Sequence, residues 1–538
     1  MLKFLEVEKV QCVFSIPGGP VLPVYDALRA QDQIHNILVR HECAGAFMAD
    51  GLARVTGTPG VCVSTMGPGA GHMVAGVATS FSDSIPILAI TGQLPNAVAG
   101  RGFQQETDHV QLFRSITKWS SLVNTAGELN SKLRRAFRVA LTGRTGPVHL
   151  DIRKDALTGD SEFCDPDPRT YRPITNPSAD PNLIRQTLGV LSESERPVIL
   201  AGGGVILASA SEELAAFAET AQVPVCTSYN GRGAVAETSK LCMGRGGEFT
   251  PSYVSDILAQ SDLLIAAGYR FTDVSMEGWS IGKETKIVQF DIDPAEIGRN
   301  FDVELGVVAD LKATFSGLLS QAGTTKKHSD WANICARKKQ QWWQHYETIM
   351  QSNSIPIKPQ RIFWELNKRL SSSDIITAGA GRGKMWAATL TNITRPRTWV
   401  HSGGYAPMGY ALCSAIGAKL GAPGRKTVAI CGDAGFQMYC EELITAVENN
   451  ASITVCIIND GCLGSIRYAQ QKSYGGRIFG TELKVNPDLS EVAKSFKADG
   501  ERVTDPSGLG AALDRSFESD VPYVIDVRVD PEENPLFA

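Results

Sequence analysis

The sequence predicts an α/β protein of three doubly wound domains, each built around a parallel β-sheet. Short runs rich in β-branched residues alternate with segments of helical pattern along the whole chain. These runs lack polar alternation, as expected for parallel strands that are buried on both faces. A chain of 538 residues is also too long for one hydrophobic core, and it favours roughly two to four domains, of which we take three.

The expected strands are eight apolar runs. They are VCVSTM (61–66), IPILAIT (85–91), PVHLDI (147–152), PVILAGGG (197–204), DLLIAAG (262–268), KIVQFDI (286–292), KTVAICGD (426–433) and ITVCIIND (453–460). Two stretches interrupt the alternation: residues 157–181 are rich in Pro, Asp, Ser and Thr, and residues 326–359 are polar, charged and end in prolines. They divide the chain into residues 1–160, 181–325 and 355–538. The first and last parts share one plan of strands, Gly-rich turns and helices.

The composition excludes several classes of function. Apolar residues make up 43% and charged residues 20% of the chain, so the sequence is not that of a disordered protein. A formal charge of -5 and the lack of a basic run argue against nucleic acid as a partner. The charged N-terminus, MLKFLEVEKVQCVF, offers no secretory signal, and no apolar stretch is long enough to cross a bilayer.

The twelve cysteines occur singly, without a CxxC pair or a histidine at zinc-ligand spacing. Scattered thiols of this kind are typical of small buried residues in a reducing compartment. We therefore expect a cytoplasmic protein that binds neither nucleic acid nor membrane. Import of a processed chain into a plastid or mitochondrion stays open.

The strongest chemical signal is a pair of aspartates at the ends of two strands. Asp433 lies in a Gly-rich turn after one strand, and Asp460 follows the next strand. The helix expected between the two strands is a single amphipathic one, and its apolar face carries Leu443, Ile444 and Val447. This strand-helix-strand unit brings both carboxylates to neighbouring strand ends. Carboxylate oxygens beside a Gly-rich turn suit Mg²⁺ shared with a diphosphate group.

The same segment resembles the thiamine-diphosphate (ThDP) binding motif, in which GDG or GDA is followed about 25 to 30 residues later by Asn-Asn. The first third resembles acetolactate synthases, the catalytic subunits of acetohydroxyacid synthase, through residues 16–28, 40–61, 64–95 and 143–155. The resemblance implies a ThDP- and Mg²⁺-dependent transferase. It also implies an N-terminal pyrimidine-binding domain, a central domain and a C-terminal diphosphate-binding domain.

By this resemblance the metal would be held by the side chains of Asp433 and Asp460 and by the backbone carbonyl of Cys462. The sequence departs from the family motif, because Asn459-Asp460 stands where the family has Asn-Asn. Aspartate still offers an oxygen ligand, so we expect Mg²⁺ to bind with one more negative charge around it.

Glu42 matches the family glutamate that binds N1′ of the cofactor's aminopyrimidine ring. The C2 proton of the thiazolium ring is weakly acidic, and a carboxyl group at N1′ favours an imino tautomer that can remove it. HSGGYAPMGYALCSAIGAKL (401–420) resembles the segment that bends the cofactor. There Met408 would lie under the thiazolium ring, and the carbonyl of Ala406 would accept from the 4′-amino group.

TAGAGRGKMWAA (377–388) resembles a turn that contacts the diphosphate, although the polar residues of the family are replaced here by Arg382, Gly383 and Lys384. From these matches we predict that Glu42 and Gln105 are catalytic. The predicted cofactor-binding residues are Gly379, Ala380, Gly381, Ala406, Met408, Gly432, Ala434, Gly435, Gly464 and Ser465. The residues predicted to line the substrate pocket are Gly19, Gln104 and Ala469.

The resemblance implies decarboxylation of a 2-oxo acid and transfer of the acyl carbanion to a second carbonyl. Two substitutions argue against the coupling of two pyruvates. Gln104 stands where the family usually has phenylalanine, and Ala469 stands where acetolactate synthases carry a tryptophan that shapes the acceptor pocket. A tryptophan side chain buries on the order of 200 Å², so its loss leaves space. We expect a donor or acceptor larger than pyruvate.

The middle third resembles the FAD-binding domain of the same group through residues 267–279 and 287–300. Arg270 and Asp273 are kept, but the segment that follows is altered, which leaves FAD binding open. Within the family the glutamate comes from one subunit and the diphosphate site from another, so the resemblance implies a homodimer or homotetramer.

Other interpretations remain for these residues. Taken singly, Glu42 could cap a helix, and Met408 could belong to a core. A ThDP-dependent decarboxylase or lyase that releases an aldehyde is the nearest alternative function. A flavin or nicotinamide oxidoreductase on doubly wound sheets is an alternative from another class, and a noncatalytic scaffold is a third, against which the intact Glu42 argues.

Overall fold

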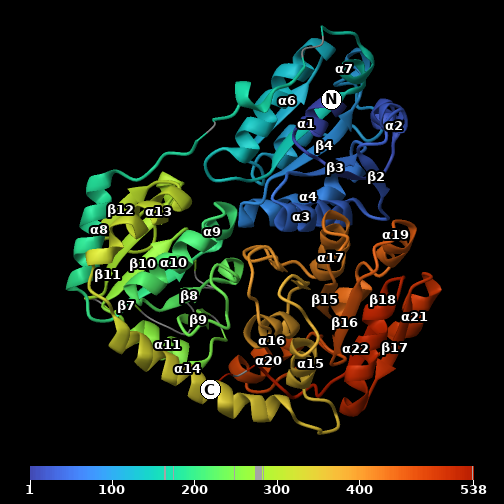
Figure 1. The fold of residues 1–538 in the computed structure, drawn as a ribbon. Helices are drawn as coiled ribbons and strands as arrows, with labels where there is room; N and C mark the ends of the chain where they lie inside the picture. Colours follow the sequence, from blue (N-terminus) through green and yellow to red (C-terminus); the bar gives the residue numbers. More distant parts are fainter. Residues whose placement is uncertain are drawn as a thin grey trace.

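The structure is a computed structural model of the chain. It describes all residues except 163–164, 174, 248, 273–280, 283, 536 and 538, and the side chain of residue 324. Figure 1 shows three lobes, with the N-terminal lobe in blue, the central lobe in green and yellow, and the C-terminal lobe in orange and red. Each lobe contains one six-stranded sheet whose strand pairs are parallel. The predicted α/β class is therefore confirmed.

The N-terminal sheet has the strand order β2-β1-β3-β4-β6-β5. Its strands are β1 (Cys12–Ser15), β2 (His35–Leu38), β3 (Gly60–Ser64), β4 (Ile87–Gln93), β5 (Trp119–Val123) and β6 (Val148–Arg153). Its helices are α1 (Leu2–Val7), α2 (Leu22–Arg29), α3 (Glu42–Thr56), α4 (Pro68–Asp83), α5 (His109–Phe113), α6 (Ala126–Leu141) and α7 (Lys154–Thr158).

The central sheet has the order β12-β11-β10-β7-β8-β9. Its strands are β7 (Pro197–Ala201), β8 (Val225–Thr227), β9 (Cys242–Arg245), β10 (Leu263–Ala267), β11 (Lys286–Asp291) and β12 (Leu305–Val308). The helices of this part are α8 (Pro181–Glu193), α9 (Gly203–Leu207), α10 (Ser211–Ala221), α11 (Ser252–Gln260) and α13 (Leu311–Gln321).

The C-terminal sheet has the order β14-β13-β15-β16-β18-β17. Its strands are β13 (Ile375–Ala378), β14 (Trp399–His401), β15 (Thr427–Gly432), β16 (Thr454–Asn459), β17 (Asp499–Val503) and β18 (Tyr523–Arg528). Its helices are α15 (Pro359–Asn367), α16 (Arg382–Leu390), α17 (Tyr410–Gly421), α18 (Asp433–Gln437), α19 (Glu442–Glu448), α20 (Gly464–Ser473), α21 (Leu489–Ser495) and α22 (Leu509–Glu518). Numbered within its own domain, this order is the same as that of the N-terminal sheet, which confirms the shared plan.

Each predicted strand is present, with bounds that differ by at most three residues. Each sheet also lies within one of the ranges 1–160, 181–325 and 355–538, and we propose these ranges as the domain bounds. The predicted break at 326–359 differs from the structure, because most of it forms α14 (Ser329–Met350). Trp331, Cys335, Trp342 and Tyr346 share one buried face of this helix and anchor it to a core. The apolar spacing within a charged sequence explains why a helix forms there.

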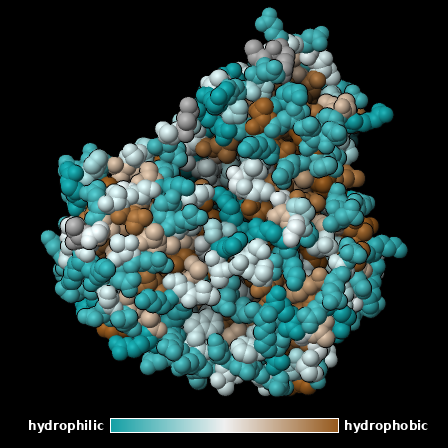
Figure 2. All heavy atoms as spheres, in the orientation of Figure 1, coloured by the Kyte–Doolittle hydropathy of each residue, from teal (hydrophilic) through white to brown (hydrophobic). Residues whose placement is uncertain are grey.

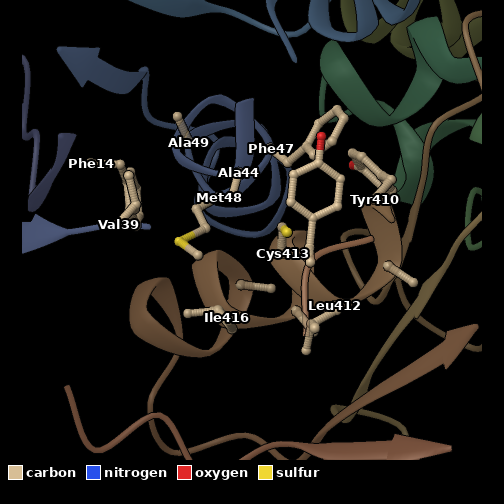
Figure 3. Packing of buried hydrophobic residues seen from close by; sticks show 14 of the residues in the cluster. Phe14, Val39, Ala44, Phe47, Met48, Ala49, Tyr410, Leu412, Cys413 and Ile416 are labelled. Atoms are coloured by element: carbon tan, nitrogen blue, oxygen red, sulfur yellow. The ribbon is translucent and has the colours of Figure 1, made fainter. Parts of the chain in front are cut away.

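The N- and C-terminal domains meet where α3 crosses α17, and the two helices share one hydrophobic core (Figure 3). Phe47 and Met48 of α3 lie against Tyr410, Cys413 and Ile416 of α17 in this view. Glycines allow the backbones to touch. A Cβ at Gly51 would lie 2.2 Å from the carbonyl oxygen of Ser414, and one at Gly417 would lie 1.9 Å from that of Met48. No larger residue fits either position without moving a helix.

A buried ionic network lies beside this crossing. Arg54 of α3 donates to Asp50 at 2.6 Å and to Asp83 at 2.7 Å, and all three side chains are buried. Asp83 also accepts the N–H groups of Gly403 and Gly404, at 2.6 and 3.0 Å. Burial opposes ionisation of Asp83, but the Arg54 guanidinium holds the pKa of this carboxyl below its usual value. The N-terminal domain therefore fixes the loop that precedes α17.

The surface view in Figure 2 shows hydrophilic side chains over most of the visible face, with apolar side chains between them, most plainly on the N-terminal lobe at the upper right. No helix in the described part of the chain combines the length and the apolar character that crossing a bilayer requires.

Candidate active site

The two predicted aspartates lie together at the carboxyl edge of the C-terminal sheet. Asp433 is the first residue of α18, directly after β15, and Asp460 follows β16. Strands β15 and β16 pair in parallel, so their carboxyl ends are neighbours. The Asp433 carboxylate accepts the N–H of Gly461 at 2.9 Å, which ties the two strand ends to each other. The predicted placement of both carboxylates at neighbouring strand ends is confirmed.

Negative charge accumulates at this edge. Burial, with a smaller contribution from the nearby Asp460 carboxylate, raises the pKa of Asp433 to about 6. No group of three or more His, Cys, Asp and Glu side chains suited to a metal occurs among the described residues. A cation here would therefore depend on the two carboxylates together with carbonyl or phosphate oxygens. That set of donors fits Mg²⁺, which takes few carboxylates and completes its shell with other oxygens.

Arg382, the first residue of α16, forms a buried ion pair with Asp460. Its other amino group donates to the carbonyl oxygens of Pro531 and Glu533, both at 2.9 Å. The guanidinium lies directly on the start of α20, since a Cβ at Gly464 would be 2.2 Å from Nε of Arg382. One positive charge thus already balances the additional carboxylate of Asp460.

A small cradle lies between α16 and α20. Gly381 has a φ of 102°, a conformation that favours glycine. A Cβ at this position would lie 3.9 Å from the hydroxyl oxygen of Ser465. That hydroxyl is buried and has no hydrogen-bond partner among the described residues. An unpaired hydroxyl beside two helix N-termini fits a phosphate group. Gly379 and Ala380, from the same turn, precede Gly381 after β13.

The cofactor-binding residues predicted around Asp433 lie along the same edge. Gly432 ends β15, and Ala434 and Gly435 form the first turn of α18. The N–H of Ala434 donates to the Asp433 carboxylate at 2.8 Å. The side of Gly432 is open, because a Cβ there would lie within 4 Å of no described residue. The third predicted metal ligand, Cys462, is buried and donates its N–H to Asp460 at 3.1 Å.

Asn486 was not among the predicted site residues. Its amide nitrogen donates to the Asp433 carboxylate at 2.9 Å and to the side-chain oxygen of Asn459 at 2.8 Å. Its own side-chain oxygen is buried and has no partner among the described residues. The sequence signal here is an Asn-Pro-Asp turn at 486–488, which indicates a turn and no site.

The predicted single helix after Asp433 is instead two short helices, α18 and α19, separated by residues 438–441. The buried face also differs. Ile444 and Val447 are half-buried, while Glu442 and Leu443 are fully buried. A carboxylate occupies this face because it has hydrogen-bond donors across the domain interface.

Glu42 is the first residue of α3 and is buried. Its carboxylate lies 2.9 Å from Nδ1 of His72 on α4. The start of α4 passes close by, since a Cβ at Gly69 would lie 3.1 Å from the other oxygen of Glu42. The carboxylate is therefore held between the N-terminal ends of α3 and α4.

Gln105 lies beside this site. It has a φ of 66°, and its backbone packs against the turn before α4, where a Cβ at Gly67 would lie 2.6 Å from its carbonyl oxygen. The Gly67 N–H donates to Nε2 of buried His109 at 2.9 Å, and Nδ1 of His109 lies 2.9 Å from Asp151. The predicted pocket residues Gly19 and Gln104 are exposed.

The segment before α17 carries the residues predicted to bend the cofactor. Ala406 has a φ of 49°, and Met408 is half-buried. Gly409 follows with a φ of 84°, and a Cβ there would lie 2.2 Å from the ring of Tyr439. The predicted acceptor-pocket residue Ala469 is exposed on α20.

A separate cavity of about 770 Å³ lies between the central domain and its two neighbours. Its lining includes the Gly-rich turn 202–204 after β7, together with Arg144, Arg270, Asp291 and Asp310. Burial raises the pKa of Asp291 to about 6 and lowers that of Arg270. Asp273, predicted to accompany Arg270, lies outside the described residues. The size and the mixed charges fit a nucleotide-containing ligand.

Comparison with protein families matches three models along the chain. Residues 1–112 match the "Thiamine pyrophosphate enzyme, N-terminal TPP binding domain". Residues 184–318 match the central domain of the same enzymes, and residues 379–527 match their C-terminal TPP binding domain.

Individual relatives are similar over nearly the whole chain. The "Probable acetolactate synthase large subunit" of Methanococcus aeolicus is 37% identical, over 99% of this chain and 91% of that protein. The "Acetolactate synthase large subunit" of Corynebacterium glutamicum is 37% identical over 98% and 85%. "Acetolactate synthase 2, chloroplastic" of Nicotiana tabacum is 35% identical over 100% and 82%. By the three matched domains in this order and these relatives, the chain belongs to the thiamine pyrophosphate enzymes and, within them, to the acetolactate synthase large-subunit family.

Proposed function

We propose that this protein is a ThDP-dependent carboligase of the acetolactate synthase type, which decarboxylates a 2-oxo acid and joins the acyl group to a second carbonyl. The observation that carries the proposal is the arrangement of two sites described above, the start of α3 and the carboxyl edge of the C-terminal sheet. A buried glutamate at the start of α3 and a carboxylate pair beside a phosphate cradle stand in a chain of this family. When bound, ThDP supplies the thiazolium carbon that becomes nucleophilic and accepts the electrons released on decarboxylation.

The residues of this chain would bind and orient the cofactor. Asp433, Asp460 and the carbonyl of Cys462 are the proposed Mg²⁺ ligands. The start of α16 and Ser465 are proposed to receive the diphosphate. Glu42 would hold a proton at N1′ of the pyrimidine, a role suited to a carboxyl group that is buried and hydrogen-bonded to His72. Met408 and the carbonyl of Ala406 would support the ring that reacts.

We propose a donor or acceptor larger than pyruvate. The support comes from Ala469, a small side chain on the exposed face of α20, in the helix that begins at the phosphate cradle. A cytoplasmic location is also proposed. It is supported by the described cysteines, which are free and, apart from half-buried Cys440, buried.

The function is tested with purified protein, ThDP, Mg²⁺ and a panel of 2-oxo acids and aldehydes. We expect acetohydroxy acids or 2-hydroxy ketones, identified by mass, with larger substrates used better than pyruvate. Glu42→Gln should lower turnover by about 100-fold or more, because proton transfer by a positioned side chain contributes 10²–10⁴-fold. Aldehyde as the sole product would point instead to a decarboxylase. Coupling restricted to two pyruvates would contradict the substrate proposal, and product formation without ThDP would contradict the function.

We also propose that the active unit is a homodimer or homotetramer with sites shared between subunits. The support is the resemblance described above, which implies that the glutamate comes from one subunit and the diphosphate site from another. A complementation experiment tests the sharing. Glu42→Gln and Asp433→Asn chains should each be inactive alone, and co-expression should restore part of the activity, since a mixed dimer has one complete site. Two inactive chains that stay inactive in a proven mixed dimer would exclude a shared site.

Asn486 is expected to strengthen metal binding by holding Asp433. Asn486→Leu should weaken the affinity for Mg²⁺ or Mn²⁺ by about 10- to 100-fold, the usual effect of removing a residue that orients a ligand. Isothermal titration of the metal in the presence of ThDP measures this directly. Asn130→Leu is the matched control, because the Asn130 side chain donates to the exposed carbonyl of Glu162, away from the aspartates. Equal metal affinity in wild type and Asn486→Leu would contradict the role.

We propose that the cavity of about 770 Å³ binds FAD. Its Gly-rich turn, its arginines and the Asp291 carboxyl suit a ligand that carries both phosphates and ribose hydroxyls. The purified protein should show the visible absorption bands of a flavin, or acquire them on incubation with FAD. Arg270→Ala should weaken FAD binding about tenfold, as the loss of a charged hydrogen-bond partner does. A protein that stays colourless and leaves the fluorescence of added FAD unchanged would refute this assignment.

A further inference from the structure

Glu442 is a buried carboxylate that reaches across the interface between two domains. It lies at the start of α19 and is 0% exposed. One carboxylate oxygen, Oε1, accepts two backbone N–H groups of the N-terminal domain, those of Arg40 and His41, both at 2.9 Å. The other oxygen accepts the hydroxyl of Thr445 at 2.7 Å. Both oxygens are thus satisfied, and one of them is committed to the other domain.

The two N–H groups directly precede Glu42 in the chain. The N–H groups at the start of a helix have no partner within the helix, and His41 is the N-cap of α3. The carboxylate of Glu442 accepts the N–H of His41, while Nδ1 of His41 accepts the N–H of Cys43 at 3.1 Å. The backbone is therefore held on both sides of Glu42.

The segment around Glu442 also holds the side chain of His41. The His41 ring meets the ring of Tyr439 edge-on, with 5.6 Å between centroids. On its other side it stacks on His72, at 4.8 Å, and His72 is the residue bonded to the Glu42 carboxylate. Tyr439 and Glu442 lie in the same short stretch that follows Asp433 and α18. The segment that follows Asp433 and α18 therefore packs against His41, the residue that precedes Glu42.

A buried carboxylate is costly unless its hydrogen bonds are complete. Burial raises the pKa of Glu442 to about 7, so the site tolerates a neutral carboxyl as well as a charged one. The feature common to both forms is an oxygen at hydrogen-bond distance from the two N–H groups. This separates the effect of geometry from the effect of charge.

We propose that Glu442 is a positioning residue for Glu42, which fixes the start of α3 from the C-terminal domain so that the Glu42 carboxylate meets the cofactor's pyrimidine. The proposal rests on the proposed function, because it acts through the role given there to Glu42. It concerns the acceptor oxygen of Glu442 and assigns no contact between Glu442 and the cofactor.

Three substitutions separate reach from charge. Glu442→Gln keeps an acceptor oxygen at full reach and removes the charge. Glu442→Asp keeps the charge and draws the carboxylate back by one methylene. Glu442→Leu removes the acceptor altogether. Glu448→Gln is the matched control, because Glu448 lies on the same helix and pairs with the same residue, Arg40, through an exposed side-chain contact at 2.6 Å.

The first readout needs no cofactor. Backbone amide exchange on the full chain, followed by digestion and mass spectrometry of a peptide spanning residues 37–44, reports the N–H groups of Arg40 and His41. Exchange should quicken at least tenfold in Glu442→Leu and Glu442→Asp and stay near wild type in Glu442→Gln and Glu448→Gln, since a lost partner exposes an N–H to local opening. Unchanged exchange in Glu442→Asp and Glu442→Leu would overturn the proposal.

The second readout follows exchange of the C2 proton of bound ThDP with deuterium, measured by NMR after acid quenching. Glu442→Asp should slow it by about tenfold or more, because a displacement of about 1 Å commonly costs up to 10²-fold. Glu442→Gln should remain within about threefold of wild type. The reverse order, with Asp near wild type and Gln slow, would show that the charge matters and overturn the positioning role.

The two failures can be told apart. A wild-type protein that does not bind ThDP with Mg²⁺ would refute the proposed function. A wild-type protein that binds ThDP and exchanges C2, while every Glu442 variant exchanges at the same rate, would refute the inference and leave the function standing. If Glu442→Leu fails to fold, as its thermal unfolding would reveal, the comparison of Asp with Gln still decides.

Discussion

The structure depends on the contact between α3 and α17, where a helix of the N-terminal domain and a helix of the C-terminal domain touch backbone to backbone. Gly51 and Gly417 permit the approach, and Phe47, Met48 and Tyr410 seal it with apolar contact. This contact positions predicted site residues on both helices. The start of α3 presents Glu42, and the segment entering α17 presents Ala406 and Met408. A change of helix spacing at this crossing would move both groups at once, because packed interiors transmit displacement.

The carboxyl edge of the C-terminal sheet and the start of α3 differ in their electrostatics. At the edge of the C-terminal sheet, two carboxylates are brought close together, and Arg382 balances the one that departs from the family motif. At the start of α3, the Glu42 carboxylate is buried beside His72 and the first turn of α4. The first arrangement suits a divalent cation with a diphosphate, and the second suits the transfer of one proton. These different surroundings explain why we propose different roles for the two sites.

Much of the fold was predictable because it depends on the local pattern of apolar and polar residues. Apolar runs of strand length predicted the parallel sheets, and the positions of Asp433 and Asp460 after two such runs predicted their meeting at one edge. The partners were less predictable. Arg382 lies 78 residues from Asp460 in sequence, and no local period connects them. Asn486 and Glu442 were not predictable for the same reason, since each contacts a residue that is distant in the sequence.

Residues 326–359 mislead for another reason. Their charge and prolines indicate a linker, while four aromatic and sulfur side chains at helical spacing bind most of the stretch to a core as α14. At 1.5 Å per residue, its 22 residues make a rod of roughly 33 Å, which runs beneath the central lobe toward the C-terminal one in Figure 1. A rod resists compression where a flexible tether would not. Because α14 packs against α11 and β9 of the central domain and against α15 of the C-terminal domain, this rod braces the two domains against each other.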